Sequence, residues 1–303
     1  MIISFFIITS LIITLYCVLI LKYYNAWNKN IYFKSENKIN NKEISISVII
    51  VARNEEENIS LCLNNIINQN YDKNLFDIIV VNDNSTDNTV DEISKLLTKG
   101  NIKLINLPET EKGKKAGIEL AIKSSNSKLI ITTDADCIVP QNWLNEIAVF
   151  YNIDEPKMII APVVLSYKNN IFEKFQALEF YSLIGTTAST AFLNAPIMCN
   201  GANLIYERSV FNELGGFDNN KNIFSGDDVF FMFKLNEHYP NSIKFLNSIN
   251  ATVKTNACDN ISDFINQRIR WASKTKYYNN FNIFYTGFIV LFINIILLLI
   301  IYF

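Results

Sequence analysis

The chain has 303 residues, with 27 lysines and arginines against 29 aspartates and glutamates, and a formal net charge of −2. A nucleic-acid-binding protein normally carries a basic surplus, so this balance argues against nucleic acid as a partner. Half of the residues are hydrophobic, which is enough for one large domain or two modest ones. The five cysteines lack metal-ligand or redox spacing, and a single histidine, His238, excludes a histidine-rich metal site.

Both ends of the chain are uncharged and apolar over lengths that can cross a lipid bilayer. Residues 2–21 contain no charged side chain, and about 20 apolar residues span the hydrocarbon core as a helix. Aromatic residues and lysines follow this run, which is typical of an anchor at the membrane interface. Residues 281–303 repeat the pattern in reverse. We predict transmembrane helices at 1–24 and 281–303 rather than two buried core helices.

The basic flanks of both apolar runs face the central region. Lysines follow the first run, and Arg268, Arg270, Lys274 and Lys276 precede the second. Cytoplasmic segments carry an excess of lysine and arginine close to the spans. We therefore expect residues 25–280 on the cytoplasmic side of the cell inner membrane, with the lipid membrane as a partner.

The central region alternates β-branched runs with segments of helical periodicity. The predicted strands are residues 44–52, 76–81, 102–107 and 128–133, and a helical pattern follows each of the first three. This alternation predicts an α/β fold with a mixed, mainly parallel sheet flanked by helices. Ligands of such sheets bind at the carboxyl ends of the strands.

Polar clusters follow all four predicted strands. They are Arg53–Glu55, Asn82–Ser85 with Asp87, Lys112–Lys115, and Asp134 with Asp136. Each alone is compatible with a solvated turn or a helix cap. Together, acids, amides and lysines suit a ligand that carries phosphates, a sugar and a divalent cation. Oxygen ligands indicate Mg²⁺ or Mn²⁺ rather than zinc. Neither GxGxxG nor GxxxxGK[ST] occurs, so the dinucleotide fingerprint and the P-loop do not apply.

These segments, taken in order, resemble glycosyltransferase family 2, whose members are inverting enzymes with the Rossmann-like GT-A fold. The resemblance covers roughly residues 45–275. "SVIIVARNEEENI" resembles the nucleotide-binding strand and turn, "VNDNSTDNT" the V-D-D-x-S-x-D-x-T segment, "KGKKAGIELAI" the basic loop and helix, and "DAD" the metal motif. "CNGANLIYER", "GGFD" and "SGDDVFF" resemble the acceptor and catalytic segments, and "QRIRW" the Q-x-x-R-W signature of membrane-bound synthases. Any one motif is weak, whereas the ordered set is strong.

The resemblance implies a role for each matching residue. The nucleotide-sugar would be bound by Ala52, Arg53, Asn54, Glu55, Asp83, Lys114, Asp134 and Ala135. Asp136 would coordinate the Mg²⁺ or Mn²⁺ that bridges the diphosphate. Asp228 would be the general base, with Asp227 as the alternative. The acceptor and the diphosphate would be contacted by Asn200, Gly201, Gln267, Arg270 and Trp271. Gln267, Arg270 and Trp271 share one helical face.

Two positions depart from the family pattern. Asp227-Asp228 stands where the family often has Glu-Asp, which leaves open which carboxylate is the base. Asn82-Asp83 stands where it often has Asp-Asp, so nucleoside contacts are expected to differ. The lysines at 112–115 are either phosphate ligands or a solvated helix start. Trp271 is either an acceptor contact or an interface aromatic beside the second span.

The predicted organisation is a GT-A catalytic domain at 25–280 between the two transmembrane helices. Its nucleotide-binding half covers about 44–137 and its acceptor half about 138–280. Within the latter, the apolar stretch at about 168–195 is predicted either to lie in the membrane interface or to be an ordinary buried helix. The expected donor is a nucleotide-sugar, for which we favour a UDP-linked sugar, and the expected acceptor is a saccharide or a lipid-linked molecule. The alternatives are a nucleotidyltransferase acting on a sugar phosphate, which would release pyrophosphate, and a non-catalytic membrane scaffold.

Overall fold

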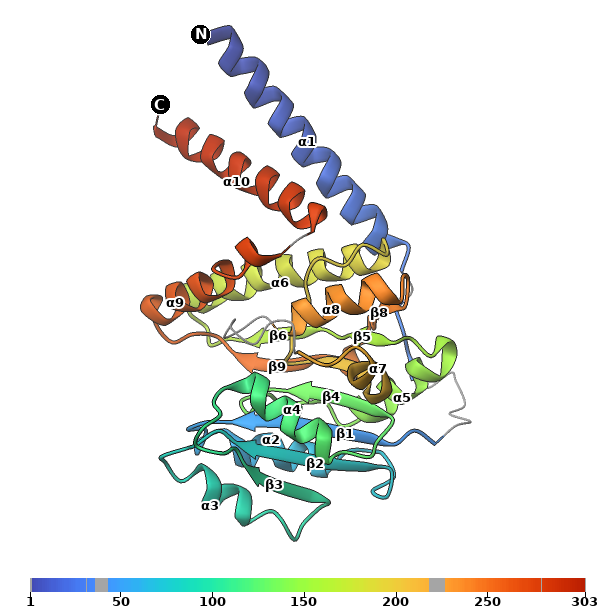
Figure 1. The fold of residues 1–303 in the computed structure, drawn as a ribbon. Coiled ribbons are helices and arrows are strands. Elements are labelled where there is room, and N and C mark those ends of the chain that lie inside the picture. Colours follow the sequence, from blue (N-terminus) through green and yellow to red (C-terminus); the bar gives the residue numbers. More distant parts are fainter. Residues whose placement is uncertain (1, 31, 36–42, 218–226, 279, 303) are drawn as a thin grey trace.

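The computed structural model describes residues 2–30, 32–35, 43–217, 227–278 and 280–302 (Figure 1). Two long terminal helices project from one side of an α/β domain, and helices α6 (Ile171–Phe192), α8 (Asp227–His238) and α9 (Ile261–Ala272) lie between them and the central strands (Figure 1). The nucleotide-binding strands predicted from the sequence lie at the end of the domain farthest from the terminal helices.

A seven-stranded mixed sheet runs through the domain in the order β3-β2-β1-β4-β7-β5-β8. Its strands are β1 (Ile46–Ala52), β2 (Phe76–Asn82), β3 (Ile102–Asn106), β4 (Leu129–Thr133), β5 (Met158–Ile160), β7 (Leu204–Glu207) and β8 (Ile243–Phe245). Strands β1 to β4 are parallel, β7 is antiparallel to β4 and β5, and β8 is parallel to β5. The predicted mixed, mainly parallel sheet is confirmed, and the four predicted strands end within two residues of the observed ones. A second sheet pairs β6 (Val163–Ser166) with β9 (Val253–Asn256).

Strand β1 is buried on both faces, which explains its unbroken apolar run. Val48 and Ile50 belong to the core on one face of the sheet, whereas Ile49 belongs to the core on the other. Side chains alternate along a strand, so a strand between two helical layers needs apolar residues at every position. Helices α2 and α5 supply the first layer, and α4 and α8 the second.

The helices of the domain vary in length from one turn and a half to six turns. They are α2 (Ile59–Ile67), α3 (Thr89–Ser94), α4 (Lys114–Ser124), α5 (Trp143–Asp154), α6 (Ile171–Phe192), α7 (Arg208–Glu213), α8 (Asp227–His238) and α9 (Ile261–Ala272), with 3₁₀ turns η3 (Ile249–Ala251) and η4 (Thr275–Tyr277). His238 is exposed at the end of α8.

Helices α6 and α9 begin with the same kind of cap. The side chain of Asn170 accepts a hydrogen bond from the backbone N–H of Glu173 at 2.8 Å, and Asn260 accepts one from Asp263 at 2.9 Å. Each asparagine amide in turn donates to the carboxylate of the same partner. This reciprocal capping satisfies N–H groups that lack a partner within the helix, so the sequence itself sets where both helices start.

The terminal helices α1 (Ile2–Asn28) and α10 (Phe281–Tyr302) pack against each other through Ile12, Ile293 and Ile296. Most of their remaining described surface is apolar and exposed. The segments Phe6–Asn28 and Phe281–Leu299 are long and apolar enough to cross a membrane. Helix α1 continues to Asn28, beyond the predicted boundary at residue 24. Its last turn packs on α6, where Ser189 donates a hydrogen bond to the carbonyl of Tyr23 at 3.0 Å.

The first prediction concerns the packing of α4 on β1. A Cβ atom at Gly117 would lie 2.7 Å from Cγ2 and 2.8 Å from Cγ1 of Val51. The β-branched side chain of Val51 has little rotamer freedom to withdraw. We expect Gly117→Ala to lower the free energy of unfolding by about 1–3 kcal/mol, the usual cost of overpacking. Urea denaturation of the detergent-solubilised chain measures this.

Gly185→Ala is the matched control, because a Cβ at Gly185 meets nothing within 4 Å. Helix propensity favours alanine over glycine by about 1 kcal/mol, so the control should be neutral or stabilising. Equal behaviour of the two variants would contradict a close α4–β1 contact.

Candidate active site

A cavity of about 550 Å³ lies between the main sheet, the two-stranded sheet and helices α4, α6, α8 and α9. It brings together nine of the site residues predicted from the sequence, which are Lys114, Asp134, Asp136, Asn200, Gly201, Asp228, Gln267, Arg270 and Trp271. They come from segments up to 157 positions apart in the chain, from Lys114 to Trp271. Five other predicted residues, Ala52, Arg53, Asn54, Glu55 and Asp83, lie at the neighbouring ends of β1 and β2. Ala135 is buried in the core beneath the acidic loop.

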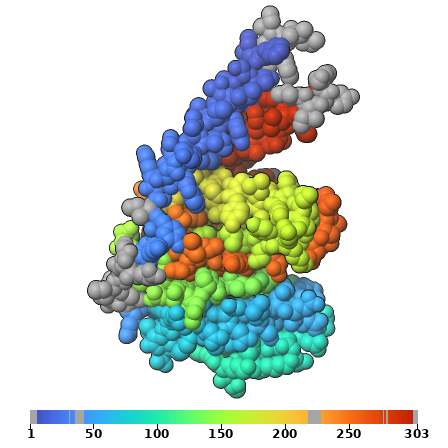
Figure 2. Space-filling view, turned by 180° about the vertical axis from the view of Figure 1, so that it is seen from behind, coloured from blue at the N-terminus to red at the C-terminus, as the bar shows by residue number. Residues whose placement is uncertain are grey.

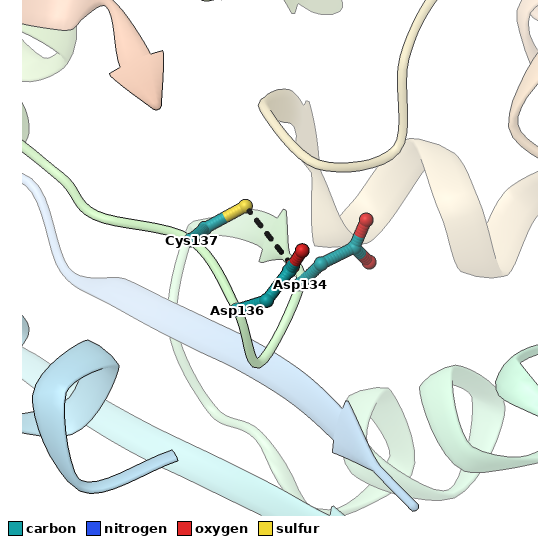
Figure 3. Close-up of side chains that lie close together, drawn as sticks. All are labelled: Asp134, Asp136 and Cys137. Carbon is teal, nitrogen blue, oxygen red and sulfur yellow. Dashed lines mark hydrogen bonds between the residues drawn. The ribbon is translucent and has the colours of Figure 1, made fainter. Parts of the chain in front are cut away.

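The loop after β4 carries the acidic part of the site (Figure 3). Ligand atoms of Asp134, Asp136 and Cys137 lie within 4.8 Å of one another. Asp134 forms an ion pair with Lys114 from the start of α4. Asp136 accepts a hydrogen bond from the Thr255 hydroxyl at 2.6 Å, which ties the loop to strand β9. Both carboxylates are partly exposed, so each retains acceptor capacity toward a ligand.

The donor set fits a hard divalent cation. Burial raises the pKa of the Cys137 thiol, with the charges of Asp134 and Asp136 acting in the same direction, so this side chain stays protonated and is no thiolate ligand. Burial also raises the pKa of Glu55, and the nearby charges of Asp136 and Asp134 reinforce the effect against a hydrogen bond from Asn58. Glu55 is close enough to sense both charges, but it neither belongs to the cluster of Asp134, Asp136 and Cys137 nor lines the cavity. Oxygen donors in this arrangement suit Mg²⁺ or Mn²⁺, whose remaining positions are normally filled by phosphates and water.

The opposite wall of the cavity holds Asp228, near the start of α8. Its Oδ2 accepts a hydrogen bond from the backbone N–H of Gly201 at 2.9 Å. A Cβ at Gly201 would lie 3.4 Å from this oxygen and 3.5 Å from Nζ of Lys114, so the absence of a side chain leaves room for both charges. Burial lowers the pKa of Lys114, but Asp134 and Asp228 outweigh that effect and raise it, so the lysine is charged. The side chain of Asp227 lies outside the part of the chain that the structure describes.

Asp83 is the most buried predicted site residue with a charge. It is 4% exposed, and its Oδ2 accepts a hydrogen bond from the Gly113 N–H at 3.1 Å and lies 3.9 Å from Arg53. Its other oxygen, Oδ1, is buried without a hydrogen-bond partner among the described residues. An unsatisfied buried carboxylate oxygen costs free energy, which a ligand N–H at this position would recover.

The loops after β1 and β2 are joined to each other. Asn54 has a positive φ of 55° and accepts a hydrogen bond from the Thr86 N–H at 2.8 Å, while its own N–H donates to Ser85 at 3.1 Å. The hydroxyl of Thr89 accepts from the Glu55 N–H at 2.7 Å. Asn54 and Glu55 therefore shape the loop with these bonds, in addition to any contact with a ligand.

Helix α9 directs Gln267, Arg270 and Trp271 to the cavity, whereas Arg268 contacts α6. Arg268 donates two hydrogen bonds to the Glu179 carboxylate, one from Nε and one from Nη2, and the distance from Nε to Oε1 is 3.1 Å. Its guanidinium also lies 4.4 Å from the ring centre of Trp271. Arg270 is exposed and lines the cavity without an ion-pair partner among the described residues. Arg268 thus holds the helix in place, and Arg270 remains available for an anion.

The second prediction concerns this support. In Glu179→Gln, Arg268 loses its carboxylate partner, and the two side chains are only 20% and 29% exposed. We expect a loss of about 1–2 kcal/mol in unfolding free energy, between the values for exposed and buried pairs. Thermal unfolding measures this loss. Glu92→Gln, whose partner Lys95 is 65% exposed, is the control and should change stability little. If both variants lose the same, Arg268 does not anchor α9.

Several cavity residues were not predicted from the sequence. Thr255 and Gln176 come from β9 and α6, and Gln176 exchanges two hydrogen bonds of 2.9 Å with the backbone of Cys258. Tyr206 is 2% exposed, and its hydroxyl has no hydrogen-bond partner among the described residues. Thr255 and Gln176 belong to no motif, and Tyr206 lies within the CNGANLIYER segment but was not singled out there. A lone threonine, glutamine or tyrosine carries no local signal of function.

The comparison with known proteins agrees with the fold. A sequence model described as "Glycosyl transferase family 2" matches residues 47–215. This range covers more than half of the chain, and it contains the acidic loop and the strands that carry the nucleotide-side residues. The chain belongs to glycosyl transferase family 2, and it is a glycosyltransferase.

Two similar curated proteins are poly-β-1,6-N-acetyl-D-glucosamine synthases. The one from Staphylococcus epidermidis strain ATCC 35984 is 24% identical over 253 residues, which cover 81% of this chain and 57% of the relative. The one from Staphylococcus aureus strain COL is 28% identical over 180 residues, which cover 57% of this chain and 42% of the relative. The chain therefore spans about half the length of the curated relatives that it matches.

Two solved structures show the same fold. Residues 1–349 of Staphylococcus aureus TarS match with a TM-score of 0.57 and 21% identity, over 70% of this chain and 60% of that one. The mannosyltransferase PcManGT from Pyrobaculum calidifontis, in complex with GDP-Man and Mn²⁺, matches with a TM-score of 0.67 and 18% identity, over 87% and 72%. The predicted GT-A fold is confirmed.

Proposed function

We propose that this chain is an inverting glycosyltransferase that moves a sugar from a UDP-linked donor to a saccharide or lipid-linked acceptor at the cytoplasmic face of the membrane. The observation that carries the proposal is one cavity that joins an acidic loop, a lysine, an arginine with no ion-pair partner among the described residues, and the separate carboxylate of Asp228. Nucleoside diphosphate binding needs the first three, and activation of a hydroxyl needs the last.

The donor would lie along the ends of β1, β2 and β4. The unpartnered Oδ1 of Asp83 can accept an N–H from a pyrimidine or purine base. Similar folds have been solved with UDP-GlcNAc (TarS, TM-score 0.53) and with GDP-Man (PcManGT). We favour uridine because the curated relatives are named N-acetylglucosamine polymer synthases. Lys114 and Arg270 would meet the diphosphate from α4 and α9.

The residues of the acidic loop would hold Mg²⁺ or Mn²⁺, chiefly Asp136, with Asp134 beside it. When bound, such an ion stabilises the negative charge that develops on the departing nucleoside diphosphate. The guanidinium of Arg270 acts on the same charge and requires no proton transfer. The hydroxyl of Thr255 keeps Asp136 oriented by its hydrogen bond at 2.6 Å.

Asp228 would act as the general base. It would accept the proton of the acceptor hydroxyl while that oxygen attacks the anomeric carbon, on the face opposite the leaving diphosphate. This direction of attack inverts the anomeric centre and gives a β-linkage from an α-linked donor. The Gly201 N–H fixes the carboxylate at 2.9 Å. Asp227 is the alternative base, and Trp271 and Asn200 would contact the acceptor sugar.

Membrane placement brings a lipid-linked or membrane-proximal acceptor within reach. Large apolar side chains line up along exposed faces of α6 and α9, which are Ile171, Phe175, Leu178 and Tyr181 on α6 and Ile261, Ile265 and Ile269 on α9. Both helices lie between the strands and the terminal helices (Figure 1). A helix that exposes such a row of apolar side chains can lie in the interface with those side chains in the acyl region. We propose this for the predicted segment at about 168–195, which corresponds to α6.

A donor screen tests the proposed reaction. The full chain in nanodiscs is incubated with UDP- and GDP-sugars, Mn²⁺ or Mg²⁺ and a membrane extract, and products are resolved by mass spectrometry. Metal-dependent release of nucleoside diphosphate is the expected result. Release of pyrophosphate from a sugar phosphate and a nucleoside triphosphate would instead identify a nucleotidyltransferase. Binding of no nucleotide by calorimetry would indicate a non-catalytic scaffold.

The third prediction concerns the nucleoside. In Asp83→Asn the amide oxygen still accepts the hydrogen bond from the Gly113 N–H. The amide NH₂ then takes the place of the unpartnered oxygen, so a donor faces the N–H of the base and no hydrogen bond can form. We expect the Kd for UDP to rise by about 10–100-fold, the worth of one charge-assisted hydrogen bond. Calorimetry measures the Kd, and the control is Asp77→Asn, near the start of the strand β2 that Asp83 follows. An unchanged Kd would remove Asp83 from the donor site.

A further inference from the structure

A second large depression lies on the other side of the wall formed by α6, β6 and β9. It measures about 690 Å³ and is lined mainly by apolar side chains, among them Trp27, Val139, Ile184, Phe245 and Ile249. This volume falls within the range of small-molecule sites, about 300–1,000 Å³. We call it the α1–α6 groove. The nucleotide-sugar site has no part in it.

The groove and the active-site cavity share their walls. Leu165 lines the cavity and its neighbour Val164 lines the groove, and on β9 the same holds for Thr255 and Lys254. Alternation along a strand explains both pairs. Helix α6 likewise contributes Phe180 to the cavity and Ile184 to the groove. The groove is therefore a separate depression that shares a wall with the active-site cavity.

The groove is continuous with the apolar surface of the first terminal helix. Trp27 lies in the last turn of α1, is 38% exposed and also lines the groove. Figure 2 shows the blue end of α1 beside the yellow helix α6, with the orange segment around residue 250 just below them. At the rim, Ile249 is 72% and Tyr181 53% exposed. An apolar surface this open in water is costly, whereas at the end of a membrane span it meets lipid.

One cation stands at the rim. Lys254 is exposed and lines the groove, and it has no ion-pair partner among the described residues. These side chains match the parts of a phospholipid. The apolar lining of the groove suits an acyl chain, Trp27 and Tyr181 suit the interfacial region, and Lys254 suits the phosphate.

We propose that the α1–α6 groove binds one anionic phospholipid of the bilayer, with an acyl chain in the apolar trough and the headgroup phosphate on Lys254. The proposal rests on the membrane placement proposed above. The lipid fills the space behind β6 and β9 and thereby supports the wall that carries Leu165 and Thr255 of the active site. Specific retention of a phospholipid separates this site from the loose lipid shell around α1 and α10.

Gly185 provides a variant that fills the groove. It lines the groove, and a Cβ built on it meets nothing within 4 Å. Leucine is a better helix former than glycine, so Gly185→Leu should fold. Gly287→Leu is the matched control, because Gly287 is also a helical glycine with open space around its position, but it lies on α10 and does not line the groove.

The full chain is reconstituted in nanodiscs of equimolar phosphatidylglycerol and phosphatidylcholine, transferred to a mild detergent and examined by native mass spectrometry. The wild type is expected to retain one phosphatidylglycerol. Gly185→Leu should retain about tenfold less phosphatidylglycerol, because displacing about two methylenes of the acyl chain from the groove lowers the affinity by that factor. Gly287→Leu should retain as much as the wild type. Lys254→Gln should bind lipid but lose about fivefold of the preference for phosphatidylglycerol, the worth of one lysine at an anionic surface.

Three results would overturn the proposal. The first is equal lipid retention by Gly185→Leu and the wild type. The second is an equal loss in both leucine variants, which would indicate only the general lipid shell. The third is a retained mass that corresponds to a second copy of the chain. Flotation of the wild type with vesicles of the same composition separates these outcomes from failure of the membrane placement, because a chain that does not float contradicts the placement itself.

Discussion

Replacing Asp136 by asparagine is expected to lower kcat/KM for sugar transfer by about 10³-fold, because the several kcal/mol that a divalent ion contributes to the transition state are lost with its main ligand. Asp136 lies within 4.8 Å of the ligand atoms of Asp134 and Cys137, so the substitution removes one of the two carboxylates of this cluster. An asparagine oxygen still accepts the Thr255 hydrogen bond, so the loop should keep its place. Release of nucleoside diphosphate in the presence of saturating Mn²⁺ measures the effect.

Two further measurements separate a metal ligand from a structural residue. Chelation by EDTA should abolish transfer by the wild type, and Mn²⁺ should restore it. Asp91→Asn, an exposed carboxylate in the first turn of α3, is the matched control and should leave activity unchanged. Transfer by Asp136→Asn at a wild-type rate with undiminished Mn²⁺ dependence would show that the ion is held elsewhere.

Replacing Asp228 by asparagine is the other substitution with a large expected effect, a fall in kcat of about 10²- to 10⁴-fold, which is the usual contribution of a positioned general base. The amide oxygen can still accept the Gly201 N–H, which Oδ2 of Asp228 now accepts at 2.9 Å, so the wall of the cavity is preserved. An amide cannot take up the proton of the acceptor hydroxyl. The Kd for UDP, measured by calorimetry, should therefore remain unchanged while turnover falls.

The same measurement on Asp227→Asn settles the choice between the two neighbouring acids. Under our proposal Asp227→Asn retains more activity than Asp228→Asn. The reverse order would make Asp227 the base. If kcat falls by less than threefold in both variants, another group accepts the proton of the acceptor hydroxyl.

A large part of this site follows from local sequence. The runs at Ile46–Ala52 and Phe76–Asn82 are apolar at every position because helices cover both faces of the sheet. Parallel strands end at a common edge, so the polar residues that follow them meet there. The structure places Lys114, Asp134 and Asp136 in the lining of one cavity; their roles in a site stay a prediction.

Other features depend on contacts between distant segments, and no local pattern encodes them. Thr255 orients Asp136 across 119 positions of sequence. The two arginines of "RIR" look equivalent in the sequence, yet Arg268 pairs with Glu179, 89 positions away, and only Arg270 lines the cavity. The difference arises from a helical rotation of about 200° between positions i and i+2, together with the place where α6 packs.

The sequence by itself determined the parallel strands, the apolar terminal helices, the caps of α6 and α9 and the loops that carry the polar motifs, because each depends on periodicity or on neighbours within a few residues. Only the tertiary structure decided how the acidic loop is tied to β9, which arginine supports α9 and which one faces the cavity, and that a groove backs onto the active site. These features depend on how separate elements pack, and packing between elements far apart in the chain leaves no mark on the local pattern of either one.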